Sequence, residues 1–347
     1  SSFNDYSGMQ PVRFNTSWDI YYEDILVEVN SFIADANEAG YNHYAGIGQI
    51  QKAAAILDMT DWWGNIPYST AGLGIEEINP TFDDQQSIYS AAFGLLDSAI
   101  TLLNGSNGGF APGSDDVIYG GNVSNWIKAA NAIKARAHLH LGQYGEALTA
   151  AKASFDSAAD NMSYTFGATQ QAGWWRFNDG RTGDIEFHPT LRAMMTDLND
   201  TDRLGVWDQT FITSHPYMKA DYRQDYISYR EIQFIIAECL KRTNGSIAEM
   251  ETAYLNGINA SFIDAGLSDA EFNTYASQTA VNPGGASLDL EDHILTQKYI
   301  GLFIQPEVFN DLRRNDFPNL VPTSGSQIPV RWNYPGDEIL FNPNVPT

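Results

Sequence analysis

The feature that most constrains the fold is a pair of apolar stripes at helical spacing, joined by one short turn. The first stripe has members three to four residues apart: Trp126, Ala130, Ile133, Ala137 and Leu141. The second stripe consists of Ala147, Leu148, Ala151 and Phe155. Residues at this spacing share one face of an α-helix, and that face has to be buried. With Gly142–Gly145 as the turn, residues 126–155 are predicted to form a helical hairpin.

Similar stripes indicate helices along most of the chain, so we predict an all-α fold. They lie within residues 25–36, 47–57, 88–102 and 229–265. The residues around the first turn resemble a tetratricopeptide-type unit, in which small side chains let two helices approach closely. These residues are Ala135, Ala137, Gly142, Tyr144 and Ala147. A looser second copy runs from Tyr229 to Ala265, with Asn244-Gly245 as its turn. Two copies at unequal spacing indicate helical hairpins and not a regular repeat array.

We expect a single domain over residues 1–347, because no stretch has the composition of a linker. Its helical scaffold is predicted over about 18–158 and about 229–314. Four loop-rich segments flank or interrupt this scaffold: about 1–17, 60–80, 160–228 and 315–347. Long segments without periodicity in a compact domain are often functional, so the binding site is expected on them.

Two local features make sharper predictions. Asp83 is predicted to cap the helix that buries the stripe from Ile88 onward, with Gln86 as its capping-box partner. Cys239 lies in an apolar stripe at helical spacing, so we interpret it as a core residue and not as a nucleophile.

The charge balance excludes two classes of partner. The chain carries 43 acidic and 19 basic residues, a formal net charge of −24. Nucleic acids and anionic lipid surfaces both require a basic face. A neutral polysaccharide is neither attracted nor repelled by such a charge, so it is still allowed as a partner.

Aromatic side chains gather in the predicted loops, at Trp62-Trp63, Trp174-Trp175 and Trp207. Sugar rings expose flat C–H faces that pack on aromatic rings, and sugar hydroxyls bond to planar polar groups. Residues 170–188 supply both kinds of side chain, so carbohydrate binding is predicted there. The alternative is that the tryptophans fill gaps between helices, since tryptophan is highly buried on average.

No catalytic motif stands out, so we expect a binding protein and not an enzyme. The acidic pairs Asp83-Asp84, Asp115-Asp116 and Glu291-Asp292 are interpreted as caps or turns, because adjacent residues on a helix do not face one another. The segment Asp197–Asp202 resembles the start of a calcium loop but lacks the glycine and glutamate of an EF-hand. We predict no cofactor, with a structural calcium ion in this segment as the weaker alternative.

Five segments, in order along the chain, together resemble the SusD/RagB family of surface glycan-binding lipoproteins of Bacteroidetes. They are Thr60–Tyr68 (TDWWGNIPY), Pro80–Tyr89 (PTFDDQQSIY), Trp126–Arg136 (WIKAANAIKAR), Gln297–Phe303 with Asp311–Arg314, and Arg331–Asn342 (RWNYPGDEILFN). The chain length fits the more compact branch of the family. The resemblance implies an all-α fold of tetratricopeptide-like hairpins, with an irregular second half that bears the glycan site. Four charged residues of these motifs are expected to hold helices and loops together: Arg136, Arg313, Arg314 and Glu338.

The resemblance also implies a cellular role. A protein of this family captures an oligosaccharide or polysaccharide at the cell surface and delivers it to a TonB-dependent SusC-type transporter in the outer membrane, without enzymatic activity. The family is lipid-anchored through an N-terminal cysteine, whereas the only cysteine here is Cys239, so we expect the sequence to be clipped at its N-terminus. The composition favours a neutral glycan, and a laminarin-type β-glucan is one candidate.

Sugar-contacting residues differ among members of this family, so our site prediction depends on loop position, aromatic faces and neighbouring planar polar groups. The predicted ligand-binding residues are Trp174, Trp175, Arg176, Asp184, Gln10, Arg13, Asn15, Trp18, Trp62 and Trp63. Two rival functions are a helical-barrel glycoside hydrolase, which would release reducing ends, and a protein-interaction scaffold that binds no sugar. The scaffold hypothesis requires the aromatic loops to be buried.

Overall fold

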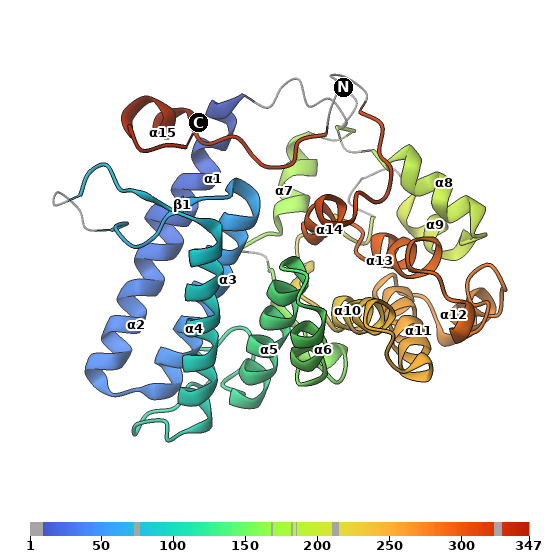
Figure 1. Cartoon of the computed structure of the whole chain (residues 1–347), viewed down its shortest axis with the longest axis horizontal. Coiled ribbons are helices and arrows are strands. Elements are labelled where there is room, and N and C mark those ends of the chain that lie inside the picture. The colour runs from blue at the N-terminus through green and yellow to red at the C-terminus, as the bar shows by residue number, and fades with distance from the viewer. Residues whose placement is uncertain are drawn as a thin grey trace. The chain divides into compact units, whose positions relative to one another are not determined.

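The computed structural model describes residues 10–72, 77–167, 169–181, 183–184, 186–209, 215–322 and 328–346. By its internal contacts the chain forms two compact units. Unit 1 comprises the described residues from Lys134 to Val321, and unit 2 those up to Ile133 and from Pro322 onward. Both units are mostly helical, which confirms the predicted all-α class (Figure 1).

Unit 2 begins with short helical turns and continues into long helices. Its first elements are a 3-10 turn η2 (Pro11–Phe14), α1 (Asn15–Asp19), a π-helical stretch η3 (Ile20–Leu26) and α2 (Val27–Ala39). The next are α3 (Asn42–Trp63), β1 (Ile66–Pro67), β2 (Phe82–Asp83), α4 (Gln85–Asn104), the first part of α5 (Val123–His140) and α15 (Gly336–Phe341). Helix α3 packs against both α2 and α4, and the three lie side by side (Figure 1).

The end of α3 differs from the prediction. The loop expected from about residue 60 begins only after Trp63, because the last turn of α3 is buried and stays helical. The Thr60 hydroxyl donates to the Gly64 carbonyl (2.7 Å), and Gly64 ends the helix with a φ of +85°. A glycine reaches this conformation without the steric cost of a Cβ atom.

Helix α4 begins one residue later than predicted. Asp84, and not Asp83, is its N-cap and accepts from the backbone N–H of Ser87 (2.9 Å). The Asp83 carboxylate instead accepts from the backbone N–H groups of Tyr68 (2.9 Å) and Ser69 (2.8 Å). Asp83 therefore stabilises the loop that precedes α4, and Asp84 caps the helix.

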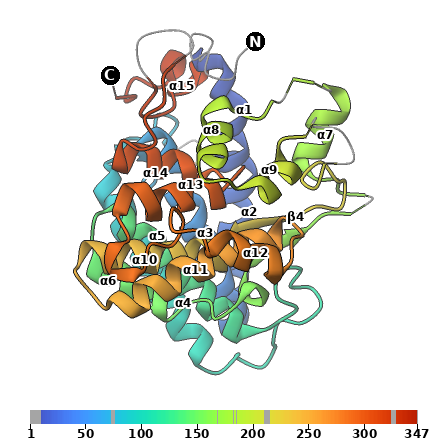
Figure 2. The ribbon, with the colours of Figure 1, turned by 90° about the vertical axis from the view of Figure 1, so that its right-hand side faces the viewer.

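Unit 1 contains the second part of α5 and a series of shorter elements (Figure 2). They are α6 (Tyr144–Lys152), η5 (Ala158–Asp160), β3 (Met162–Thr165), α7 (Gly173–Gly180), α8 (Pro189–Asp197), α9 (Thr201–Trp207) and β4 (Arg223–Ile227). The chain continues through α10 (Tyr229–Arg242), α11 (Ile247–Asp264), α12 (Asp269–Ala276), η6 (Gly285–Ser287), η7 (Leu290–Leu295), α13 (Thr296–Gly301) and α14 (Glu307–Asn315). Helices α7, α8 and α9 contradict the prediction that residues 160–228 lack helices.

Two small antiparallel sheets occur in the described residues. Strand β1 pairs with β2, with Ile66 opposite Asp83. Strand β3 pairs with β4, with Thr165 opposite Arg223 and an irregularity next to Met162. The pairing of β3 with β4 places the side chains of β4 beside the N-terminus of α10.

Both predicted helical hairpins are present. Helix α5 leads into α6 through Gly142, whose φ of +69° makes the turn. Helix α10 leads into α11 through Asn244, with a φ of +52°, and the two helices pack against each other. Cys239 on α10 is fully buried, as predicted.

An apolar cluster in unit 1 lies between α8, α9 and α13. Trp207, which was predicted to be a loop aromatic, lies on α9 and is fully buried there, with its ring stacked on that of Phe303 (centroids 5.1 Å apart). Arg203, one turn earlier on α9, is also fully buried and binds the Asp200 carboxylate (2.9 Å from Nε). Trp207 is therefore part of the core and not of the binding site.

Candidate functional site

The predicted tryptophans of unit 2 form a packed aromatic cluster. Trp63 is fully buried and donates from Nε1 to the carbonyl of Asn333 (3.1 Å). Trp18 is 5% exposed, and its ring meets that of Trp63 edge to face at 5.1 Å. Neither ring has a free face for a sugar, so both drop out of the candidate set. Here the tryptophans fill gaps between elements, which was the alternative interpretation.

Trp62 has a related role at the edge of this cluster. Its ring stacks on Trp332 with centroids 4.5 Å apart, and its carbonyl accepts from the Trp332 backbone N–H (2.7 Å). Both rings are only partly exposed. Trp62 thus attaches the segment from Trp332 to the end of α3, which leaves little of its face for a ligand.

The N-terminal polar residues lie in unit 2 as well. Asn15 is partly exposed, but its amide is engaged within the protein, since Nδ2 donates to Asp337 (2.7 Å) and Oδ1 accepts from the Gly336 N–H (2.8 Å). Gln10 and Arg13 are exposed. This set belongs to unit 2, whereas the Trp174 set belongs to unit 1.

Helix α7 carries the most accessible aromatic surface. Among the tryptophans in the described ranges, Trp174 alone has more than a third of its surface exposed, at 37%. Phe177 is three residues further on and is also exposed, so the two rings share one side of the helix. Arg181 lies over the Phe177 ring (5.4 Å to its centroid) and binds Asp184 (2.6 Å from Nε). We call Trp174, Phe177, Arg181 and Asp184 the α7 platform.

The other predicted residues of this segment are less well placed. Arg176 is exposed, but it is two residues from Trp174 and does not share its side of the helix. Trp175 is partly buried. The tryptophans that were predicted to lie in a loop thus sit on a two-turn helix, and only one of them presents an open face.

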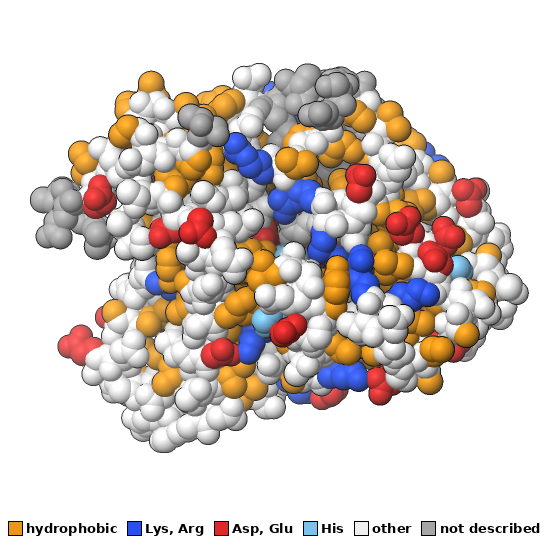
Figure 3. Space-filling model, viewed as in Figure 1, with side chains coloured by type: hydrophobic (Ala, Val, Ile, Leu, Met, Phe, Trp, Pro, Cys, Tyr) orange, Lys and Arg blue, Asp and Glu red, His pale blue; other side chains and the backbone are white. Residues whose placement is uncertain are grey.

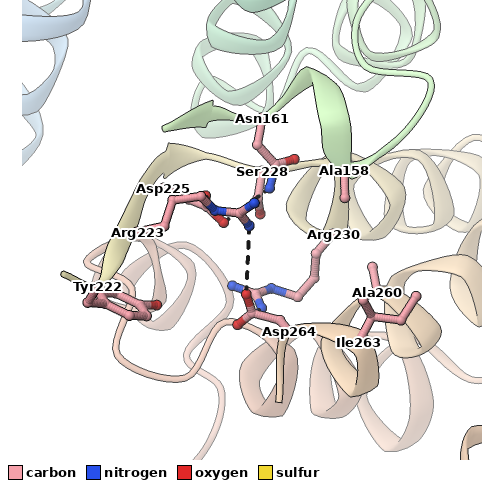
Figure 4. A pocket seen from close by; sticks show the side chains of 10 residues that line it. All are labelled: Ala158, Asn161, Tyr222, Arg223, Asp225, Ser228, Arg230, Ala260, Ile263 and Asp264. Carbon is pink, nitrogen blue, oxygen red and sulfur yellow. Dashed lines mark hydrogen bonds and ion pairs between the residues drawn. The ribbon is translucent and has the colours of Figure 1, made fainter. Parts of the chain in front are cut away.

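A second candidate is a cavity of about 370 Å³ in unit 1. It lies beside β4, the start of α10 and the end of α11 (Figure 4). Its lining residues are Ala158, Asn161, Tyr222, Arg223, Asp225, Ser228, Arg230, Ala260, Ile263 and Asp264. None of these residues was predicted.

Two carboxylates, the buried Asp225 and the partly buried Asp264, face two guanidinium groups in this cavity. Arg230 Nη1 donates to Asp264 Oδ2 (2.7 Å), and Arg223 Nε approaches Asp225 Oδ1 (3.2 Å). Burial raises the pKa of Asp225. Burial acts in the same direction on Asp264, but there the Arg230 guanidinium outweighs it and lowers the pKa of the carboxyl. The four charges balance, so the cavity has no formal net charge.

Two of the three acidic pairs are used in caps and turns, as predicted, whereas Glu291 and Asp292 lie in the first turn of η7, which Asp289 caps. Asp116 accepts from the backbone N–H groups of Ile118 (3.0 Å) and Tyr119 (3.1 Å), and Asp84 caps α4. Asp200, in the calcium-like segment, is ion-paired with Arg203. Within the described ranges, no group of three or more histidine, cysteine, aspartate or glutamate side chains could hold a metal ion.

The match to a protein family decides the classification. The family described as "Starch-binding associating with outer membrane" matches residues 2–211 and 204–335. The chain belongs to the SusD-like family. No curated protein matches this SusD-like chain in sequence.

Solved structures show the same fold. A SusD/RagB family protein from Bacteroides thetaiotaomicron has a TM-score of 0.76 and 21% identity, over 98% of this chain and 85% of its own. A chitin-binding protein has a TM-score of 0.78 and 23% identity, over 96% and 83% of the two chains. A Bacteroidetes SusD-like protein has a TM-score of 0.80 and 18% identity, over 96% and 86%. The SusD-like fold thus spans nearly the whole chain.

Two of the four charged residues of the SusD-like motifs join separate helices, as predicted. The Arg136 guanidinium binds the Glu231 carboxylate through Nε (2.6 Å) and Nη2 (2.7 Å). Arg314 binds Glu238 in the same two-pronged way (2.5 and 2.9 Å). Arg313 bonds to Asn310 on its own helix, and Glu338 accepts from Asn342 at the end of its own helix. None of these contacts involves the α7 platform.

In the described part of this SusD-like chain, no helix is long and apolar enough to cross a bilayer. Figure 3 nevertheless shows hydrophobic side chains gathered over α15. Ile339, Leu340 and Phe341 are each more than half exposed, and α15 buries none of its residues. This exposed group, the α15 patch, is one of the apolar features of unit 2.

The cavity residues were missed because their segment has no helical period. Residues 222–230 read Tyr-Arg-Gln-Asp-Tyr-Ile-Ser-Tyr-Arg, with aromatic or apolar side chains next to charged ones. That alternation of side-chain types was the available signal, since it is typical of a short strand with one polar face. Asp264, which completes the site, follows 34 residues after Arg230 and only the hairpin fold brings it close.

Proposed function

We propose that this SusD-like protein captures a neutral oligosaccharide or polysaccharide on the α7 platform, without transforming it. The observation that carries the proposal is the open face of Trp174, the most exposed tryptophan of the described chain. A flat apolar face next to an Arg–Asp pair matches the two needs of a sugar ring, a C–H contact and hydroxyl hydrogen bonds. Membership of a family described as starch-binding supports this assignment.

The first experiment compares glycan binding by wild type, Trp174→Ala and Trp174→Phe. The panel contains starch, chitin oligomers and laminarin, tested by affinity electrophoresis and calorimetry. We expect Trp174→Ala to weaken binding at least about tenfold, since tryptophans at the centre of an interface carry much of its binding energy. Trp174→Phe, which keeps an aromatic face, should retain part of the affinity.

The control is Phe341→Ala, which removes an even more exposed aromatic ring from α15. It should bind glycan like wild type. Binding that survives Trp174→Ala, or an absence of any ligand in the panel, would contradict the proposal. Release of reducing ends from a bound glycan, lost on a single carboxylate substitution, would favour the glycosidase alternative.

We further propose that the protein sits at the outer-membrane surface, held there by a lipid anchor, and passes its ligand to a SusC-type TonB-dependent transporter. The family description, which includes association with the outer membrane, supports this role. The α15 patch is the surface to test first, because exposed apolar patches often mark interaction sites. Co-purification with a SusC-type transporter should be lost in a Leu340→Ser/Phe341→Ser variant.

A further inference from the structure

The cavity of unit 1 has the size of a ligand site. Its volume of about 370 Å³ falls within the range of roughly 300–1,000 Å³ typical of small-molecule pockets. Three lining residues are apolar: Ala158, Ala260 and Ile263. The other lining residues are the two carboxylates and two guanidinium groups, together with Asn161, Ser228 and the Tyr222 ring.

The carboxylates of the lining are fixed by further hydrogen bonds. The Asp225 carboxylate accepts from Ser163 Oγ (2.6 Å) and Asn161 Nδ2 (3.1 Å). Asp264 accepts from the Tyr217 hydroxyl (3.1 Å) as well as from Arg230. These partners hold the polar atoms in place before any ligand arrives, which lowers the entropic cost of binding.

Two charged groups of the lining are partly exposed. The Arg223 side chain is 47% exposed and that of Asp264 is 17% exposed, and Arg223 Nη2 stays 4.0 Å from Asp264 Oδ1 (Figure 4). Both groups can therefore form hydrogen bonds with a ligand. Arg230, in contrast, is 95% buried, and its Nε is covered by protein atoms and has no hydrogen-bond partner in the described structure.

We propose that this cavity is a second, separate site that binds one or two units of a neutral sugar. The partly exposed Arg223 guanidinium can donate to a sugar hydroxyl, and the partly exposed Asp264 carboxylate can accept from one. Because the charges of the lining balance, a neutral ligand is favoured. Ala260 and Ile263 are the apolar lining residues that can contact the C–H face of the ring. This site goes beyond the α7 platform and does not depend on it.

A free amino acid is the rival ligand, because it carries one group for each sign of charge. Its carboxylate would compete with Asp264 for Arg230 and would lie near a second buried carboxylate, Asp225. The carboxylate of the amino acid would be repelled by the carboxylates of Asp264 and Asp225, which disfavours this ligand. The rival is therefore tested directly, with glycine and L-leucine as probes.

The experiment uses the Trp174→Ala protein, in which the α7 platform is silenced, and titrates maltose, laminaribiose and N,N′-diacetylchitobiose. Ala260→Leu fills the cavity with a larger side chain and should weaken disaccharide binding at least about tenfold. Tyr222→Phe removes one hydroxyl while keeping the ring against Tyr217, and should weaken binding roughly threefold to tenfold. Ala248→Leu, an exposed position on the same helix, is the control and should change nothing.

The outcomes separate the two sites. Disaccharide binding that persists in Trp174→Ala and is lost in Ala260→Leu supports the cavity site, whatever happens on the platform. The cavity site is overturned if no disaccharide binds to Trp174→Ala, if Ala260→Leu binds as well as Ala248→Leu, or if only the amino acids bind. Polysaccharide binding that needs Trp174 but ignores Ala260→Leu supports the platform independently of this result.

Discussion

At the scale of single residues, buried ion pairs decide how this protein responds to pH. Glu238 on α10 is fully buried and contacts Arg314, Arg242 (2.8 Å from Nε) and Lys298 (3.6 Å from Nζ). Burial by itself would raise the pKa of Glu238, but the three cations outweigh it and lower the pKa to about 2. A carboxylate with a lowered pKa in the folded state stabilises that state wherever it is ionised.

This predicts the behaviour of Glu238→Gln. In the unfolded chain glutamate has a pKa of about 4.3, so the stabilisation from Glu238 is complete above that pH and is lost as the pH falls toward 2. At pH 7 the variant should be less stable by about 3 kcal/mol, because the buried Lys298 and Arg314 then share one carboxylate, that of Asp311, instead of two. Urea denaturation at several pH values should show this gap narrowing below about pH 4.5.

Glu249→Gln is the matched control, since the ion pair of Glu249 with Lys152 is solvent-exposed. Exposed pairs contribute little, so its stability should follow wild type at every pH. A gap between wild type and Glu238→Gln that stays constant from pH 7 to pH 2 would contradict the assignment.

The roles of some of these residues could be predicted from the sequence, and those of others could not. Arg136 and Arg314 belong to motifs whose spacing matches a family, so their structural role could be predicted. Tyr222 and Asp264 were missed, because the site they share exists only after β4 and the α10–α11 hairpin have packed together. Trp63 and Trp18 were misassigned, since sequence shows an aromatic residue but not which of its faces is covered.

At the scale of elements, close helix packing depends on glycine. A Cβ atom at Gly257 on α11 would lie 2.9 Å from the Phe234 ring on α10, and one at Gly301 on α13 would lie 2.7 Å from the same ring. Phe234 is fully buried and cannot swing away. The ring of Phe234 thus fits between two glycines, and the three helices are held together there.

Gly257→Ala should therefore destabilise the protein, although alanine is the better helix former by about 1 kcal/mol. Overpacking against Phe234 typically costs about 1–3 kcal/mol, which leaves a net loss. Thermal unfolding measures the change, and a second substitution, Phe234→Leu, should remove the clash and much of the added penalty. Gly94→Ala on α4 is the control: its Cβ would meet nothing within 4 Å, so it should raise the melting temperature. A Gly257→Ala protein as stable as Gly94→Ala would show that α10 and α11 pack less tightly.

Helices were predictable in proportion to their length. The α5–α6 and α10–α11 hairpins carry apolar stripes over several turns, so periodicity revealed them. Helices α7, α8 and α9 have seven to nine residues each, too few to show a clear period. Helices this short are stabilised mainly by tertiary packing, which the local sequence does not display.

At the scale of the whole molecule, the protein carries a net charge of −24, so the effect of salt on binding depends on whether the ligand is charged. A neutral glycan held by ring contacts and hydroxyl hydrogen bonds releases no counterions, so its affinity should be the same at 50 mM and 500 mM NaCl. Calorimetry with the best glycan of the panel measures this. An anionic glycan held by Arg181 would instead lose affinity steeply over that range, and such a result would contradict the neutral-ligand proposal.

Unit 2 is built from both ends of the chain, with unit 1 inserted between them. Its aromatic cluster closes only when Trp332 stacks on Trp62 and the Asn333 carbonyl accepts from Trp63. A chain that emerges with its N-terminal end first must therefore hold Trp62 and Trp63 uncovered until more than 260 further residues have followed. We expect unit 1 to fold before unit 2. Until the segment from Trp332 onward is available, we expect chaperones to cover the exposed tryptophans of unit 2. A single proteolytic cut between Pro322 and Trp332 would reopen the same surface in the finished protein.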